Sequence, residues 1–131
     1  MTLVLLVDAA NVVGSRPDGW WRDRAGAATR LRDRLAALVA GGVDGAAFGL
    51  PGRQMPVVRL VVEGAAGGVR SAGGVEVVTA EHDGDTTIVR LAEAARPDEH
   101  TVVVTADREL RSRVTAAGAA VVGPRTLLDL L

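Results

Sequence analysis

The chain has no cysteine and no lysine among its 131 residues, and each absence excludes a class of chemistry. Without cysteine there is no disulfide framework and no thiolate nucleophile or metal ligand. Without lysine there is neither a P-loop, whose lysine contacts phosphates, nor Schiff-base catalysis. All 15 basic residues are arginines. In a chain this rich in Ala, Gly and Val, a GC-rich coding sequence is the simplest explanation of that bias.

Aromatic residues and long apolar runs are also scarce. Only 2% of the residues are aromatic, namely Trp20, Trp21 and Phe48, so the core depends on small and branched aliphatic side chains. No apolar stretch approaches the roughly 20 residues that span a bilayer. The apolar N-terminal run stops at Asp8, without the pattern of a signal peptide. We therefore expect one domain over residues 1–131, located in the cytoplasm and without membrane contact.

The charges are unevenly distributed along the chain, although the net charge is only −1. Residues 1–59 contain eight arginines and five acids, whereas residues 76–107 contain eight acids and two arginines. This asymmetry is typical of an acidic centre beside a basic surface, and it is equally compatible with ordinary solvated helices.

Five apolar segments alternate with helical patterns. Strands are predicted at residues 3–7, 57–62, 75–79, 101–104 and 119–122. Helices are predicted at residues 25–40, 86–95 and 108–117 and from Pro124 onward. The Gly- and Pro-containing segments 14–24 and 41–56 are predicted to be loops. Strands that alternate with helices indicate an α/β fold, in which a mostly parallel sheet lies between helical layers.

Acidic and amide side chains follow three of the predicted strands. These residues are Asp8 and Asn11 after the first strand, Asp83 and Asp85 after the third, and Asp107 after the fourth. Because the carboxyl ends of parallel strands meet at one edge of a sheet, we expect the carboxylates to converge there. Such a cluster repels itself unless a cation lies among the acids, and oxygen ligands suit Mg²⁺ or Mn²⁺. The chemistry that this arrangement serves best is metal-assisted hydrolysis of a phosphodiester.

Three motifs in the chain resemble the NYN branch of the PIN-like nuclease superfamily, in particular the small bacterial proteins predicted to bind RNA. The motifs are Val7-Asp8-Ala9-Ala10-Asn11-Val12-Val13, Asp83-Gly84-Asp85-Thr86-Thr87-Ile88 and Val103-Val104-Thr105-Ala106-Asp107-Arg108-Glu109-Leu110. They occur in the family's order, and the resemblance spans nearly the whole chain. It implies a three-layer sandwich with a five-stranded sheet of order 3-2-1-4-5, and a ribonuclease site that uses Mg²⁺ or Mn²⁺.

The resemblance also implies roles for individual positions. Asp8, Asp85 and Asp107 match the metal-binding acids of the family, and two further residues, Asn11 and Thr105, match its polar helpers. Thr105 is expected to hydrogen-bond a ligating carboxylate or metal-bound water. The predicted strand 57–62 ends in Glu63, where relatives usually have Asp. A fourth acid can therefore be either Glu63 or Asp83.

The segment between the first strand and the first long helix combines two tryptophans with three arginines. These residues are Arg16, Trp20, Trp21, Arg22 and Arg24. Aromatic rings beside guanidinium groups suit the stacking of bases and the contact of phosphates in single-stranded RNA. In the alternative interpretation, one tryptophan closes the core and the other lies at a protein interface. A homodimer is compatible with that alternative.

These observations predict a divalent-metal-dependent endoribonuclease with RNA as its partner. Two alternatives stay open: a non-catalytic RNA- or ribosome-associated module of the same fold, and a nucleotide phosphohydrolase. A signalling receiver domain is excluded by the missing lysine. A haloacid-dehalogenase-type phosphatase is excluded because Ala10 stands where that class needs a second Asp.

Overall fold

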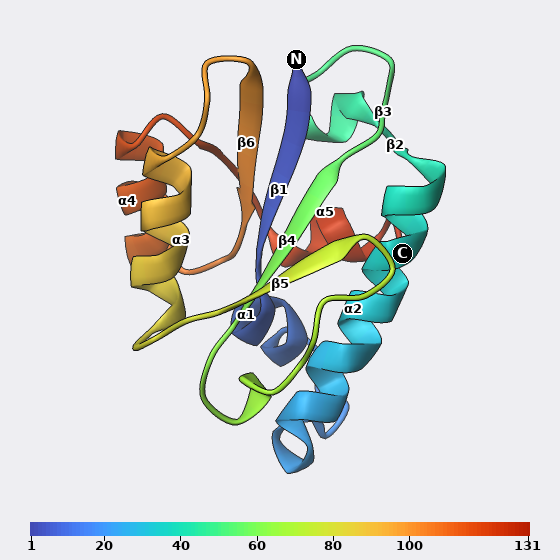
Figure 1. Cartoon of the computed structure of the whole chain (residues 1–131), viewed down its shortest axis with the longest axis vertical. Helices are drawn as coiled ribbons and strands as arrows, with labels where there is room; N and C mark the ends of the chain where they lie inside the picture. The colour runs from blue at the N-terminus through green and yellow to red at the C-terminus, as the bar shows by residue number, and fades with distance from the viewer.

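A computed structural model describes residues 1–131, and its centre is a parallel sheet. The five strands of this sheet are β1 (Thr2–Asp8), β4 (Val57–Val62), β5 (Val75–Thr79), β6 (Glu99–Val104) and β7 (Ala120–Val122). They lie in the order β5-β4-β1-β6-β7, and every neighbouring pair is parallel. Numbered along the five predicted strands, this order is 3-2-1-4-5, so the predicted α/β fold is confirmed (Figure 1).

Helices cover both faces of the sheet (Figure 1). One face carries α1 (Ala9–Gly14), α2 (Arg24–Gly41) and α5 (Pro124–Leu128), and the other carries α3 (Gly84–Glu93) and α4 (Arg108–Ala116). The five strands of the sheet and the helices α2 to α4 begin and end within two residues of their predicted bounds. None of the helices is long and apolar enough to cross a membrane.

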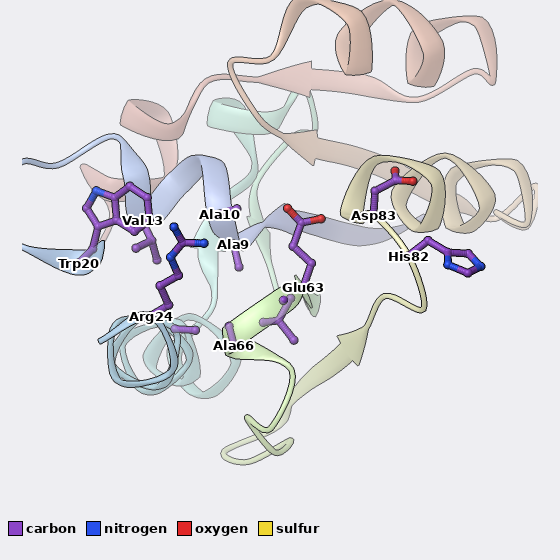
Figure 2. A pocket seen from close by; sticks show the side chains of 12 residues that line it. Ala9, Ala10, Val13, Trp20, Arg24, Glu63, Ala66, His82 and Asp83 are labelled. Carbon is purple, nitrogen blue, oxygen red and sulfur yellow. The ribbon is translucent and has the colours of Figure 1, made fainter. Parts of the chain in front are cut away.

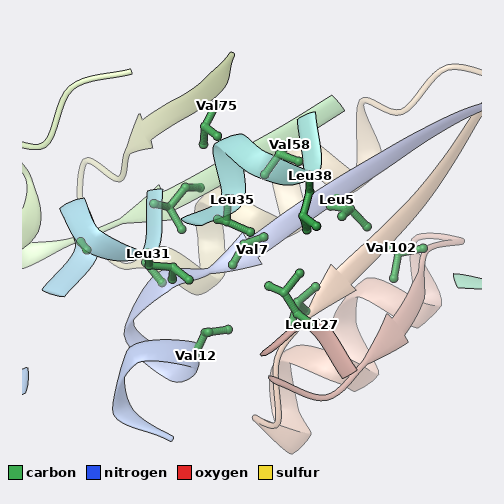
Figure 3. Packing of buried hydrophobic residues seen from close by; sticks show 14 of the residues in the cluster. Leu5, Val7, Val12, Leu31, Leu35, Leu38, Val58, Val75, Val102 and Leu127 are labelled. Carbon is green, nitrogen blue, oxygen red and sulfur yellow. The ribbon is translucent and has the colours of Figure 1, made fainter. Parts of the chain in front are cut away.

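The central strand β1 is buried on both faces, which explains its unbroken apolar sequence. Leu3, Leu5 and Val7 pack toward α2 and α5, in a cluster that includes residues of both helices (Figure 3). Val4 and Leu6 belong to the second cluster, with residues of α3 and α4. Since β1 pairs with β4 on one side and β6 on the other, its last residue lies at the middle of the sheet's carboxyl edge.

The structure differs from the sequence prediction in two connecting segments. The segment 41–56, predicted as a loop, contains a small antiparallel pair of strands, β2 (Val43–Asp44) and β3 (Arg53–Gln54), with a 3-10 turn (Gly45–Phe48) between them. The guanidinium group of Arg53 donates hydrogen bonds to the carbonyl oxygen of Gly41 and so closes this segment onto the end of α2. Strands of two residues are too short to show an alternating pattern, so this prediction was wrong.

The second difference follows Asp8, where the structure has the short helix α1 and the sequence predicted no helix. The predicted loop 14–24 likewise contains a single 3-10 turn (Trp20–Arg22) before α2 begins. Both elements are shorter than two turns of an α-helix, so hydrophobic periodicity gives no signal for them.

Candidate active site at the carboxyl edge of the sheet

The carboxyl edge of the sheet brings together acids from four connections. Asp8 ends β1, Glu63 follows β4, Asp85 lies in the first turn of α3 after β5, and Asp107 precedes α4 after β6. Of the residues predicted for the site, Asn11, Thr105 and Asp83 also lie at this edge, on α1 or in the connections that lead into α4 and α3. The parallel topology therefore places the predicted acids at one end of the molecule.

Asp8 is the most buried acid of this group, with only 8% of its surface exposed. The hydroxyl group of Thr105, which is itself fully buried, donates a hydrogen bond of 2.9 Å to its Oδ2 atom. The same hydroxyl oxygen accepts the backbone N–H of Asp107 at 3.2 Å. Thr105 thus links the carboxylate of Asp8 to the residue that precedes α4, and the hydrogen bond expected between Thr105 and an acid of the site is present.

Burial of its carboxyl group raises the pKa of Asp8 from the ordinary value of 3.8 to about 6. The hydrogen bond from Thr105 acts in the opposite direction, and the negative charges of Asp85 and Glu63 raise the pKa further. The three carboxylates therefore act on one another electrostatically.

Asn11 and Asp107 fix the connection between β6 and α4. The Oδ1 atom of Asn11 accepts the backbone N–H of Ala106 at 2.8 Å. The Oδ1 atom of Asp107 accepts the N–H of Leu110 at 3.0 Å and caps the N-terminus of α4. Since capping uses only one carboxylate oxygen, the other oxygen of Asp107 is available for a cation or a substrate.

Asp83 caps α3 with both of its oxygens. Oδ1 accepts the backbone N–H of Thr86 at 2.7 Å, and Oδ2 accepts the hydroxyl of the same residue at 3.0 Å. These two hydrogen bonds hold the pKa of the exposed Asp83 below its usual value. The geometry thus gives Asp83 a structural role at the start of the helix.

Glu63 extends from the end of β4 to the same helix terminus. Its Oε2 atom accepts the backbone N–H of Gly84, the first residue of α3. A Cβ atom at position 84 would lie 2.9 Å from this oxygen, so glycine is what permits the close approach. Burial raises the pKa of the half-buried Asp85, and the charges of Asp107, Asp83 and Glu63 raise it further. The charge of Glu63 thus acts on both Asp8 and Asp85, whereas that of Asp83 acts on Asp85.

The acidic cluster of Asp8, Glu63, Asp85 and Asp107 has no cationic side chain in ion-pair contact. The two ion pairs of the molecule join Arg32 to Asp33 and Arg59 to Glu76, away from the cluster. The charge of Arg113 lowers the pKa of Asp85 but does not outweigh the effects that raise it. The oxygen donors are of the type that Mg²⁺ and Mn²⁺ prefer.

The acids are nevertheless not arranged as a closed metal cage. No three His, Asp or Glu side chains lie close enough together to hold one metal ion between them. Mg²⁺ is commonly bound by one or two carboxylates, with water and substrate oxygens at the remaining positions. The donor set fits an ion bound in that open manner.

Four of the five residues predicted to bind substrate lie together, and Arg16 lies apart from them. The Trp20 and Trp21 rings meet edge to face, with centroids 6.1 Å apart and planes at 88°. The guanidinium of Arg24 lies 5.4 Å from the centroid of Trp20, and that of Arg22 lies 6.0 Å from Trp21. Neither tryptophan belongs to a core cluster, and Trp21 is 53% exposed. The interpretation in which one tryptophan closes the core is therefore not supported.

Trp20 and Arg24 line a pocket of about 380 Å³ that reaches Glu63 and Asp83 on its other side (Figure 2). Arg16 lies apart from this pocket. It borders a hollow with Arg30 and Arg34, and a second hollow with Arg125. The pocket was not predicted, because its walls come from segments that are distant in the sequence.

Comparison with known proteins shows the fold but no family. No family model matches the chain, and no curated protein matches it. Among solved structures, it is similar to Rae1 (YacP) from Bacillus subtilis. A tryptophan-to-leucine mutant of that protein matches with a TM-score of 0.73 and 22% identity over 99% of this chain and 74% of the other. A second structure, with no mutation named, matches with a TM-score of 0.71 and 22% identity over 97% and 72% of the two chains. At this identity, the similarity shows a shared α/β architecture.

Proposed function

We propose that the chain is a divalent-metal-dependent endoribonuclease of the PIN-like, NYN type. The observation that carries this proposal is the carboxylate of Asp8, which is buried, lacks an ion-pair partner and lies beside the charges of Asp85 and Glu63. A buried carboxylate among like charges is costly for a protein to maintain, so such groups are concentrated at functional sites.

Five residues of the site have a chemical or positioning task in this proposal. One or two of the carboxylates of Asp8, Asp85 and Asp107 would hold Mg²⁺ or Mn²⁺, with water and substrate oxygens at the remaining positions. Such an ion, when bound, polarises a phosphoryl oxygen and lowers the pKa of a coordinated water. Thr105 and Asn11 are positioning residues: Thr105 orients Asp8, and Asn11 holds the connection that precedes Asp107.

The direct test is cleavage of single-stranded RNA by the purified protein in Mg²⁺, in Mn²⁺ and in EDTA. We expect cleavage only with a divalent ion, and a loss of about 100-fold or more in Asp8→Asn and Asp107→Asn. Asp98→Asn is the matched control, because Asp98 lies at the opposite end of the sheet, just before β6. RNA that stays intact with both metal ions would contradict the proposal.

The absence of a closed three-ligand group favours one alternative, a non-catalytic RNA-binding module of the same fold. The same variants separate the two functions. A binding module retains its affinity for RNA when Asp8 or Asp107 is replaced by Asn, and it cleaves RNA under none of the three conditions.

A further inference from the structure

A pocket of about 380 Å³ opens beside the acidic cluster (Figure 2). Its floor includes Ala9 and Ala10, which directly follow Asp8 in the sequence. Trp20 and Arg24 form one wall, and Glu63 lies on the opposite side. Glu63 therefore belongs both to the acidic cluster and to the wall of the pocket.

The size and lining of the pocket suit a flat aromatic ligand. Its volume falls within the range of about 300–1,000 Å³ that is typical of small-molecule sites. Small side chains such as Ala9, Ala10 and Ala28 leave the space open, and most of the lining is apolar. Trp20 and the guanidinium of Arg24 lie 5.4 Å apart and offer planar groups of the kind on which RNA bases stack. Arg24 and Glu63 add a hydrogen-bond donor and an acceptor.

The position of the pocket constrains its ligand further. A ring above Ala9 and Ala10 lies within one or two residues of Asp8, so a phosphate attached to it through a sugar can reach the acidic cluster. A nucleotide has this arrangement of parts, because its base and its phosphate are attached at different positions of the ribose. The bases of single-stranded RNA are free to leave the stack and enter such a pocket.

We propose that this pocket receives one unstacked nucleobase of the RNA substrate, that of the nucleotide adjoining the phosphodiester at the acidic cluster. This inference rests on the proposed ribonuclease function and names the substrate subsite beside it. Arg24 stacks on the base, and the small side chains of α1 and α2 set the depth of the pocket.

The intrinsic fluorescence of Trp20 provides the test. The Trp21→Phe variant leaves Trp20 as the single tryptophan, and Trp21 is exposed enough to be replaced without disturbing the core. This variant is titrated, in Mg²⁺, with the four nucleoside 5′-monophosphates and with ribose 5-phosphate. We expect a saturable fluorescence change with at least one nucleotide and none with ribose 5-phosphate, which has the phosphate but lacks the base.

Two further variants in the same background place the ligand. Ala10→Leu fills the pocket from an exposed helix position, and Arg24→Gln removes the stacking plane. Each is expected to weaken nucleotide binding about tenfold, the effect of losing one stacked base. Ala37→Leu is the matched control, because it makes the same substitution at an exposed position of α2 outside the pocket. It is expected to bind like the parent.

The outcomes separate this inference from the proposed function. No fluorescence change with any nucleotide, or equal binding by the parent and both pocket variants, overturns the base pocket, even if RNA is cleaved. Nucleotide binding that both pocket variants weaken supports the base pocket, even if no RNA is cleaved. In that second case the endoribonuclease proposal fails while the pocket stands.

Discussion

At the scale of single residues, the carboxylate of Asp8 determines how the site responds to pH. A folded protein in which the pKa of an acid is raised binds its proton more tightly than the unfolded chain does. The stability from this group is therefore fully present below the ordinary pKa of 3.8 and is lost as the pH rises through about 6. The difference between these pKa values corresponds to about 3 kcal/mol.

This linkage gives a first prediction for the metal-free protein. As the pH rises from about 4 to about 7 in EDTA, Asp8→Asn should gain up to about 3 kcal/mol in unfolding free energy relative to the wild type, because the amide carries no charge. Urea unfolding of both proteins across this pH range measures the difference, which isolates Asp8 from the other titrating groups. A difference that is independent of pH would show that Asp8 has an ordinary pKa.

The same carboxylate predicts how divalent ions affect stability. An ion that binds only the folded state stabilises it by about 2.7 kcal/mol at about 100 times its Kd. Since the ligands must be deprotonated, Mg²⁺ or Mn²⁺ should raise the melting temperature more at pH 8 than at pH 5. The increase should be absent in Asp8→Asn and retained in Asp98→Asn. An equal increase in all three proteins would place the ion elsewhere.

At the scale of secondary-structure elements, two acids at the N-terminus of α3, Asp83 and Glu63, make different contacts. Asp83 directs both oxygens at Thr86, whereas Glu63 contacts Gly84 and acts on Asp8 and Asp85. The sequence left the fourth place in the acidic set open between these two residues, and the different contacts of their carboxylates provide a way to test which of them fills it.

This difference predicts opposite phenotypes for the two acids. Asp83→Ala should lower the melting temperature, because α3 loses its cap, while the effect of Mn²⁺ on that temperature persists. Glu63→Gln should leave the cap intact and weaken the effect of Mn²⁺. Thermal unfolding with and without Mn²⁺ measures both quantities. If Asp83→Ala abolished the response to Mn²⁺ and Glu63→Gln did not, the two assignments would be reversed.

A comparison of the predicted and the observed elements shows which features could be predicted from the sequence. The strand β1 was predictable because it is an unbroken apolar run that ends at a charge. The position of Asp8 and Asp107 at the carboxyl edge of the sheet was predictable because each follows a strand. The contact between Glu63 and Gly84 could not be predicted, because it joins two connections that meet only once β4 and α3 have packed. The strands β2 and β3 were likewise not predictable, because each has only two residues and they pair across a turn.

At the scale of the whole molecule, the uneven distribution of charge along the sequence corresponds to arginines that line two hollows, one of them beside the acidic cluster. Arg16 borders one hollow with Arg30 and Arg34, and Asp18 is the one acid there. It also borders a second hollow with Arg125 and Ala106, and Ala106 precedes Asp107 of the acidic cluster. Asp129 is the one acid of the second hollow. Across the two hollows Arg16, Arg30, Arg34 and Arg125 outnumber the acids four to two, and none of these arginines is in an ion pair. We call these four residues the basic track.

A basic track of this kind should contact the phosphates of an RNA strand that ends in the site. Because we expect the Asp107→Asn protein not to cleave RNA, its affinity for single-stranded RNA can be measured at several salt concentrations. Replacing Arg30 and Arg34 together by Glu should weaken binding and reduce the slope of log Kd against log salt by about 1.4, since each lost contact with single-stranded RNA contributes about 0.7. The matched control replaces Arg90 and Arg111, exposed residues of α3 and α4 on the other face of the sheet, and should leave that slope nearly unchanged. An equal reduction in the two double variants would mean that RNA responds to the overall charge of the protein and not to this track.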